Sequence, residues 1–214
     1  MFAKAYDLLM ADVDYEAIYL WLAPYIAKDD VIIDAGCGSG YLLEEFVKRD
    51  YLAIGIDIDS SMLSIALDRL TEKQLNAQLY EHDLRESLGI KVDVILMMFD
   101  VINYFKGASN IFKNLYQGLN SGGKLILDFY REEVLQDYHD YEEDGEEPIS
   151  YRWTIHTKKE RLIHHVTAGQ ETNQIIQYVK PKDYYIGLLN SLGFEVSLKD
   201  GPDERKHYLV AYKK

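Results

Sequence analysis

The sequence predicts an α/β protein, in which helices cover both faces of a doubly wound, mostly parallel sheet and a small antiparallel unit follows. Three observations support this prediction. Short apolar runs alternate with segments of helical spacing as far as residue 130. The first run ends in the glycine-rich turn Asp34–Gly40. Between Ser150 and Val179 the apolar residues instead recur with a period of two, which is typical of antiparallel strands.

The size and charge of the chain narrow its class. Its 214 residues fit one domain with an elaboration, and its net charge of -13 disfavours nucleic acid and anionic membranes as partners. Cys37 is the single cysteine, so no intrachain disulfide forms, and the six histidines make no paired metal motif. No apolar run reaches the ~20 residues of a membrane span, and no signal-peptide pattern opens the chain. We expect a cytoplasmic monomer or homodimer without a metal, acting on a small molecule.

The first 130 residues predict the parallel sheet. Two helices, broken near 12–14, precede the first strand. The strands that we expect next are Val31–Ile33, Leu52–Ile56, Gln78–Glu81, Val92–Phe99 and Lys124–Phe129. Helices are expected between them at Leu42–Lys48, Ser60–Leu70 and Ser109–Leu119. Strands joined by helices of this length run parallel to one another.

The later part of the chain predicts an insertion and a return to the sheet. Residues 136–147 carry seven acids and predict a mobile, solvated loop, and a three-stranded meander follows over 150–179. Pro181 opens a helix to Leu192, and two closing strands are expected at 194–198 and 207–212. We therefore expect residues 1–130 and 181–214 to form the main domain and 131–180 to form an inserted substrate roof.

The glycine turn predicts a site for an adenosine-containing ligand. Ligands of open parallel sheets bind at the carboxyl ends of the strands, where Gly36 and Gly38 leave the backbone open and Asp57 would reach ribose hydroxyls. The dinucleotide fingerprint would require glycine where Tyr41 stands. The carboxylate of Asp34 is unfavourable beside a pyrophosphate but suits the ammonium of a methionine moiety. This chemistry favours S-adenosylmethionine over NAD.

Four segments, in order, resemble the motifs of class I S-adenosylmethionine-dependent methyltransferases: Val31–Tyr41, Gly55–Leu63, His82–Leu84 and Gly122–Asp128. The flanking segments resemble a bacterial small-molecule subgroup, similar to the aminosugar N,N-dimethyltransferases and to uncharacterised Firmicutes methyltransferases. Those segments are Tyr6–Met10, Val13–Tyr15, Ile149–Trp153 and Ile163–His165. The resemblance implies a Rossmann-like sheet of seven strands, mostly parallel, with an antiparallel final strand.

The resemblance also implies a role for individual residues. Asp34 would accept from the methionine amino group, Asp57 from the ribose hydroxyls and Asp83 from the adenine amine. Cys37 is interpreted as a small filler residue of the turn and not as a nucleophile. The expected cofactor-binding residues are Tyr6, Asp34, Gly36, Cys37, Gly38, Gly40, Asp57, Ile58, Met62, Asp83, Leu84 and Phe99.

Two further residues are candidates for positioning the methyl acceptor. Asn103 and Tyr104 follow the buried fourth strand, where the reacting atom should lie. The sequence does not decide whether the acceptor atom is nitrogen or oxygen. Two other functions also stay open: a sensor that binds S-adenosylmethionine without catalysis, and, less favoured, an NAD-dependent oxidoreductase. The oxidoreductase would require glycine at position 41 and a further parallel strand after the fifth.

Overall fold

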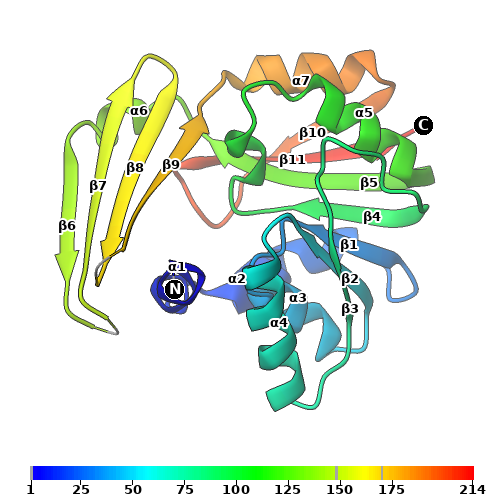
Figure 1. Cartoon of the computed structure of the whole chain (residues 1–214). Helices are drawn as coiled ribbons and strands as arrows, with labels where there is room; N and C mark the ends of the chain where they lie inside the picture. The colour runs from blue at the N-terminus through cyan, green and yellow to red at the C-terminus, as the bar shows by residue number, and fades with distance from the viewer. Residues whose placement is uncertain (1, 148, 170) are drawn as a thin grey trace.

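Two sheets form the scaffold of the protein (Figure 1). The computed structural model describes residues 2–147, 149–169 and 171–214. The larger sheet has seven strands, which lie in the order β10 (Phe194–Lys199), β11 (Lys206–Lys213), β5 (Leu119–Tyr130), β4 (Val92–Met97), β1 (Val31–Ala35), β2 (Leu52–Asp57) and β3 (Gln78–Glu81). β11 runs antiparallel to both of its neighbours. The predicted fold class is confirmed.

The strand order reverses between β1 and β4. From β1 the chain proceeds outward through β2 to β3, and it then returns to place β4 on the other side of β1. Ile33 of β1 lies opposite Ile54 of β2 and Ile95 of β4 in register. A reversal of this kind leaves a crevice at the carboxyl ends of the two central strands.

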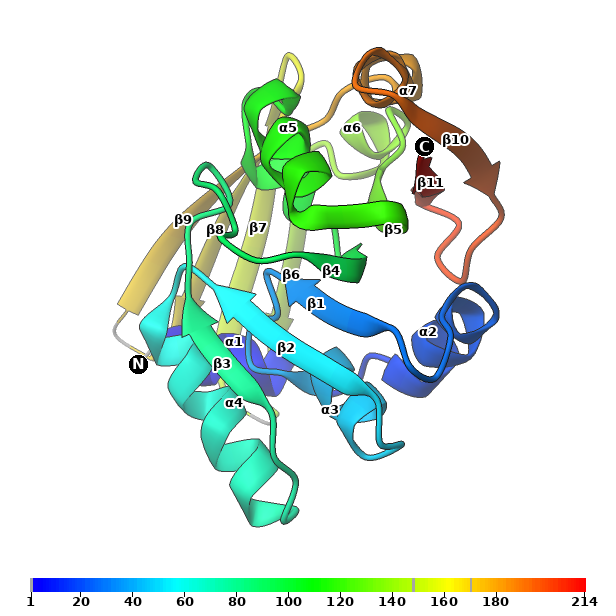
Figure 2. The ribbon, with the colours of Figure 1, turned by 90° about the vertical axis from the view of Figure 1, so that its right-hand side faces the viewer.

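Helices cover both faces of this sheet (Figure 2), and apolar side chains are buried between the helices and the strands. On one face Phe112 and Tyr185 pack beneath α5 and α7, and on the other Leu22 and Phe46 pack beneath α2 and α3. The helices are α1 (Phe2–Leu9), α2 (Tyr15–Leu22), α3 (Tyr41–Val47), α4 (Ser60–Glu72), α5 (Ser109–Gly118), α6 (Val134–Asp137) and α7 (Lys182–Ser191), with 3-10 turns η1 (Ala23–Tyr25) and η2 (Val101–Tyr104). In the described ranges, none of these helices combines the length and apolarity that crossing a membrane requires.

The smaller sheet is antiparallel and stands beside η2 and the carboxyl ends of β4 and β5. It consists of β6 (Tyr141–Gly145), β7 (Tyr151–Lys158), β8 (Arg161–Ala168) and β9 (Glu171–Tyr178). The last three strands are the predicted meander. The expected mobile loop over 136–147 is wrong, because α6 ends within it and β6 pairs with β7 there.

The acidic residues concealed this edge strand. Tyr141 packs with Val134 and Trp153 in a small apolar cluster, while Glu142 on the other face of the strand pairs with Arg152 at 2.8 Å. An edge strand tolerates charged side chains on its exposed face, so high charge did not exclude a strand.

The fourth strand is shorter than the sequence predicts. β4 ends at Met97, because Phe99 and Asp100 both adopt the left-handed conformation, with φ of 61° and 54°. Neither residue is glycine, and each such conformation costs ~1–3 kcal/mol unless its surroundings hold it in place. The turn after β4 is therefore under conformational strain, at the edge of the crevice.

The two leucines of α2 provide a matched test of the core. Leu22 is fully buried, whereas Leu20 on the same helix is 61% exposed. Leu22→Ala should lower the free energy of unfolding by about 2–5 kcal/mol, and Leu20→Ala should change it by less than about 0.5 kcal/mol. Urea denaturation of both variants measures the difference. Equal losses would mean that α2 does not pack on the sheet as described.

Candidate active site

Two adjoining cavities open at the carboxyl ends of the central strands. The first has a volume of about 480 Å³ and lies over the glycine turn between β1 and α3. The second, of about 550 Å³, lies between the large sheet and the inner face of the small one. Both are lined by the same five uncharged residues, so these form the junction between the cavities: Tyr6, Met10, Phe99, Tyr104 and Ile175.

The glycine turn forms a cradle of bare backbone. The N–H groups of Gly36 and Cys37 both donate to the carbonyl of Ile56, at 2.8 and 3.0 Å, which fixes the turn against β2. Gly38 has a φ of +53°, and a Cβ added to it would meet no atom within 4 Å. Gly38 therefore presents open backbone to the first cavity, as a ligand that lies on the turn requires.

Gly36 and Gly40 serve packing as well. A Cβ on Gly36 would lie 2.7 Å from Val101, so the turn approaches η2 too closely for a side chain. Gly40 does not line the cavity; it caps α3 with a φ of 80°, and an added Cβ would lie 2.9 Å from Ala66 of α4. The expected cofactor role of Gly40 is thus an indirect one, through the packing of α3 on α4.

Asp34 is a buried carboxyl group, one oxygen of which finds no partner in the described part of the chain. It is 4% exposed, lines the first cavity, and its Oδ2 has no hydrogen-bond partner among the described residues. Burial, and secondarily the charge of Asp57, raises the pKa of Asp34 to about 7. A buried, unpaired carboxyl group is costly, and an ammonium group bound beside it would remove that cost.

Asp57 stands at the end of β2 and faces the same cavity. Its Oδ2 accepts from the N–H of Gly38 at 2.8 Å and its Oδ1 from that of Asp59 at 2.9 Å. Burial raises the pKa of its carboxyl group. The carboxylate thus links the glycine turn to the start of α4 and lies where vicinal hydroxyls of a ligand on the turn could donate to it.

Asp83 has a partner that sequence reasoning missed. Arg85 binds both carboxylate oxygens through its guanidinium group, with Nε 2.9 Å from each, and this pairing lowers the pKa of Asp83. Arg85 itself also lines the first cavity. An adenine amine would have to share the Asp83 carboxylate with Arg85 or displace the Arg85 guanidinium from it. The sequence does hold a signal for this ion pair, since an acid and an arginine stand two residues apart.

The remaining expected residues lie at this cavity as well. Ile58, Met62 and Leu84 line it, with Ile58 60% exposed. Cys37 lines it too, is buried, and has a thiol pKa that burial raises. A thiol that stays protonated is a poor nucleophile, which fits the interpretation of Cys37 as a filler residue.

The two expected acceptor-positioning residues separate in the structure. Tyr104 stands at the junction of the cavities, is 43% exposed and forms a hydrogen bond with Tyr6. Asn103 is fully buried and lines neither cavity. Its amide donates to the carbonyl of Tyr178 at 2.7 Å and accepts from the N–H of Tyr130 at 3.1 Å. Asn103 therefore joins the two sheets and holds Tyr104 in place without facing the cavity.

An ion cluster forms part of the wall of the second cavity. Lys206 lies 2.6 Å from Asp100 and 3.4 Å from Asp128, and all three are at least nine-tenths buried. Asp128 also accepts from the N–H of Asp100, and Gln177 donates to the carboxylate of Asp100. No motif in the sequence points to Lys206 or Gln177, which lie far along the chain from Asp100. No group of His, Cys, Asp or Glu in the described ranges is arranged to hold a metal ion.

Comparison with known proteins finds methyltransferases. Residues 32–123 match the profile of a methyltransferase domain. A Bacillus subtilis protein, YqeM, is 27% identical over 91% of this chain and 85% of its own length. Its name assigns it provisionally as a methyltransferase.

Two solved structures share the whole fold. Streptomyces venezuelae DesVI superposes with a TM-score of 0.83 at 20% identity, covering 100% of this chain and 99% of that one. The sugar N-methyltransferase KedS8 from Streptoalloteichus gives 0.82 at 18% identity, covering 98% and 93%. Fold, glycine turn and domain match together define a methyltransferase with a Rossmann-like sheet. The domain match covers less than half of the chain, and the matched proteins support S-adenosylmethionine as the methyl donor.

The buried carboxyl group of Asp34 predicts a pH dependence of cofactor binding. Because its folded-state pKa is raised, the unliganded protein is most stable with Asp34 protonated and loses this stability as the pH rises through about 7. The ammonium of the cofactor requires the ionised form. The Kd for S-adenosylmethionine should therefore increase roughly tenfold or more as the pH falls from 7.5 to 5.5. Calorimetry measures this Kd at each pH. Asp34→Asn should bind the cofactor weakly, with a Kd that does not depend on pH in this range. A pH dependence that persists in the variant would show that Asp34 is not the titrating group.

A pair of glycines tests the cradle. Gly38→Ala fills open space at the turn, so it should weaken cofactor binding by about tenfold or more because the methyl group occupies the place of the ligand. Gly89 is the control, since it also has a positive φ and open surroundings but does not line the cavity. Gly89→Ala should carry a similar cost in stability, measured by thermal unfolding, with unchanged binding. Equal cofactor affinity in both variants would show that the cofactor does not lie against the backbone of Gly38.

Proposed function

We propose that this protein transfers a methyl group from S-adenosylmethionine to a nitrogen atom of a small molecule held in the second cavity. The observation that carries the proposal is the position of Asp100. Its carboxylate lines the second cavity directly after Phe99, which belongs to the junction with the first. Asp100 and Asp128 together place two carboxyl groups against the single ammonium of Lys206, so an amine nitrogen of a ligand is attracted to this side of the junction.

The first cavity suits the cofactor in its chemistry. The unpaired carboxyl group of Asp34 fits an ammonium, the open backbone of Gly38 leaves room for a ligand on the turn, and Asp57 fits ribose hydroxyls. When bound, S-adenosylmethionine supplies a methyl group on a positively charged sulfur. In this arrangement Phe99 and Tyr104 would enclose the methyl group and exclude water from it.

The groups around the junction favour an amine over a hydroxyl as acceptor. A hydroxyl needs a base, whereas an amine attacks without one once it is neutral. Burial raises the pKa of Tyr6 to about 12; desolvation of the phenol group of Tyr104, together with its contact with Tyr6 and the charge of Asp100, raises the pKa of Tyr104 as well, so both phenols keep their protons. Trp153 donates to Nδ1 of His164, so the neutral ring carries its proton on Nε2 and offers no free lone pair. Each of these groups is a poor base near neutral pH.

The relatives are consistent with this proposal. KedS8 is named as a sugar N-methyltransferase, and CalS10 from Micromonospora echinaspora is named as an amino pentose methyltransferase. Both share the fold, with TM-scores of 0.82 and 0.77, including the part of the chain that forms the second cavity here. The aromatic wall of that cavity, which includes Tyr130, Tyr138 and Trp153, suits the apolar face of a sugar-like ring.

Methyl transfer from labelled S-adenosylmethionine to fractionated metabolites tests the proposed function. The expected product keeps its label under conditions that cleave methyl esters, since the new bond joins carbon to nitrogen. A sensor without catalysis would bind the cofactor and label nothing. Label that is lost with an ester, or that resides on a hydroxyl oxygen, would show that the acceptor atom has been assigned incorrectly.

Asp100→Asn is the variant that probes the acceptor side. Asparagine tolerates the left-handed backbone of position 100, so the turn should persist while the charge is lost. We expect kcat/KM for the amine acceptor to fall about 10- to 100-fold, with the Kd for S-adenosylmethionine changed less than about twofold. Asp68→Asn, on the exposed surface of α4, is the control and should leave both constants unchanged. A parallel loss of cofactor affinity would place Asp100 in the first cavity.

A further inference from the structure

The second cavity carries more negative charge than a single ammonium group requires. Two of its charged lining residues are cations, Lys206 and Arg205, and both of these are already paired. The carboxylates that line it are Asp14, Asp100, Asp128, Glu143 and Asp203. The described lining is therefore negative overall, as is the whole chain at -13.

Neither cation is available to an anionic acceptor. The ammonium of Lys206 lies between Asp100 and Asp128. The guanidinium of Arg205 binds the carboxylate of Asp203 through Nε at 2.9 Å and Nη2 at 2.8 Å, and it also donates to the phenol of Tyr138 at 2.6 Å. A phosphate or carboxylate on the acceptor would have to break one of these pairs and would face the remaining carboxylates.

Glu143 is a charged group without a cationic partner in the described part of the chain. It lies on β6, where the phenols of Tyr141 and Tyr151 donate to its two oxygens, the first at 2.5 Å. These hydrogen bonds lower the pKa of its carboxyl group, so it stays ionised. Asp14, on the α2 side of the cavity, caps that helix by accepting from Ala17 at 2.9 Å. Two carboxylates that no described cation neutralises thus lie away from the junction.

His164 supplies an independent sign of a ligand in the same cavity. The residue is only 5% exposed and lines the cavity, and its Nε2 has no partner in hydrogen-bonding geometry within the described ranges. Burial lowers the pKa of the ring, so it is neutral. Because Trp153 occupies Nδ1 at 3.2 Å, His164 carries its proton on Nε2; the contact of this N–H with Gln177 falls short of hydrogen-bonding geometry, so an oxygen of a ligand could complete it.

We infer that the acceptor carries a second ammonium group besides the nitrogen that is methylated, carries no phosphate or carboxylate, and places its distal ammonium near Glu143. This inference rests on the proposed function and specifies its substrate class. An amino-alcohol or diamino-sugar skeleton satisfies both features of the cavity, with its ammonium groups towards the carboxylates and a hydroxyl oxygen towards His164. Anionic acceptors are excluded by charge repulsion and not by size.

A series of three probes of equal chain length tests the charge requirement. Calorimetry in the presence of S-adenosylhomocysteine compares 1,5-diaminopentane, pentylamine and 5-aminopentanoate, which differ only in the distal group. We expect the diamine to bind about tenfold more tightly than the monoamine, and the amino acid to show no binding. Equal or tighter binding of the amino acid would overturn the inference, and so would the failure of all three probes to bind.

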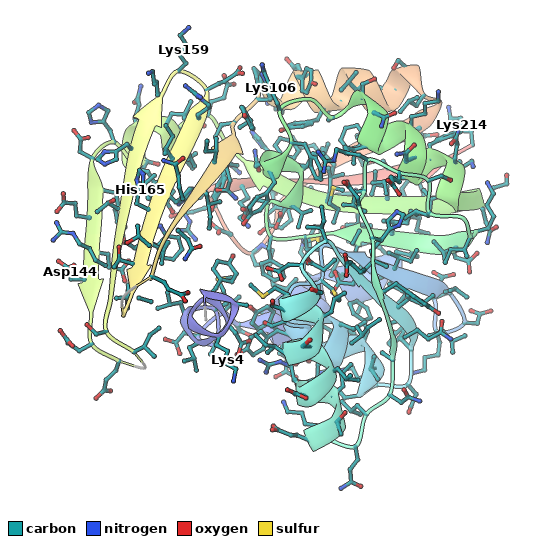
Figure 3. All side chains as sticks on the ribbon, viewed as in Figure 1. Lys4, Lys106, Asp144, Lys159, His165 and Lys214 are labelled. Carbon is teal, nitrogen blue, oxygen red and sulfur yellow. The ribbon has the colours of Figure 1, made fainter. Side chains whose placement is uncertain are left out.

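A pair of variants on β6 locates the distal ammonium. Glu143→Gln should remove most of the advantage of the diamine over pentylamine and leave the Kd of pentylamine unchanged. Asp144→Asn is the matched control, because Asp144 is on the same edge strand (Figure 3) but faces outward, where it lies 3.9 Å from Arg152. An advantage that is unchanged in Glu143→Gln, or lost equally in both variants, would contradict the assignment to Glu143.

The charge of the natural product separates this inference from the proposed function. After methyl transfer to a metabolite extract, the labelled product should elute from a cation exchanger with a diamine standard and later than glucosamine. Elution with monoamines or retention on an anion exchanger would overturn the inference and leave the methyltransferase activity intact. An extract without any labelled product would contradict the proposed function itself.

Discussion

The strained turn after β4 and the wall of the second cavity depend on the ion cluster of Asp100, Asp128 and Lys206. The turn after β4 places two consecutive non-glycine residues, Phe99 and Asp100, in the left-handed conformation. Asp128 accepts backbone hydrogen bonds from both of them, and Lys206 balances its charge. Burial by itself would lower the pKa of Lys206, but the charges of Asp100 and Asp128 raise it, so the ammonium persists in the interior. The cluster offsets a backbone strain of ~1–3 kcal/mol per residue.

The reversed direction of β11 makes this cluster possible. Because β11 is antiparallel to β5, its first residues lie at the carboxyl ends of the parallel strands, and Lys206 pairs in register with Tyr130 at the end of β5. A parallel strand in this position would place its last residues there. The first residue of β11 and the turn before it therefore bring Lys206, Arg205 and Asp203 to the cavity as one short segment. Through Asp100 and Gln177, the same cluster extends to β9, and Asn103 adds a second link to that strand.

The parts of the site that could be predicted are those whose contacts are local or follow from strand order. Asp34 and Asp57 end adjacent parallel strands, so the sheet alone brings them to one cavity. The cluster around Lys206 could not be predicted, because it joins residues 28 and 78 positions apart through the register of β5 with β11. Asn103 was expected to position the acceptor, but its hydrogen bonds to Tyr130 and Tyr178 hold its amide away from both cavities.

The distribution of charge along the two cavities agrees with the chemistry of an amine acceptor. A methyl donor with a positively charged sulfur repels an acceptor nitrogen that is still protonated, and the residues that line both cavities are uncharged. The carboxylates of the second cavity stand behind this junction, so an ammonium is stabilised there and a neutral nitrogen is favoured at the junction. An acceptor with two amino groups can satisfy both conditions at once: one nitrogen stays charged near Glu143, and its charge lowers the pKa of the other. The second charge would thus hold the acceptor in place and also ease the deprotonation of the nitrogen that attacks.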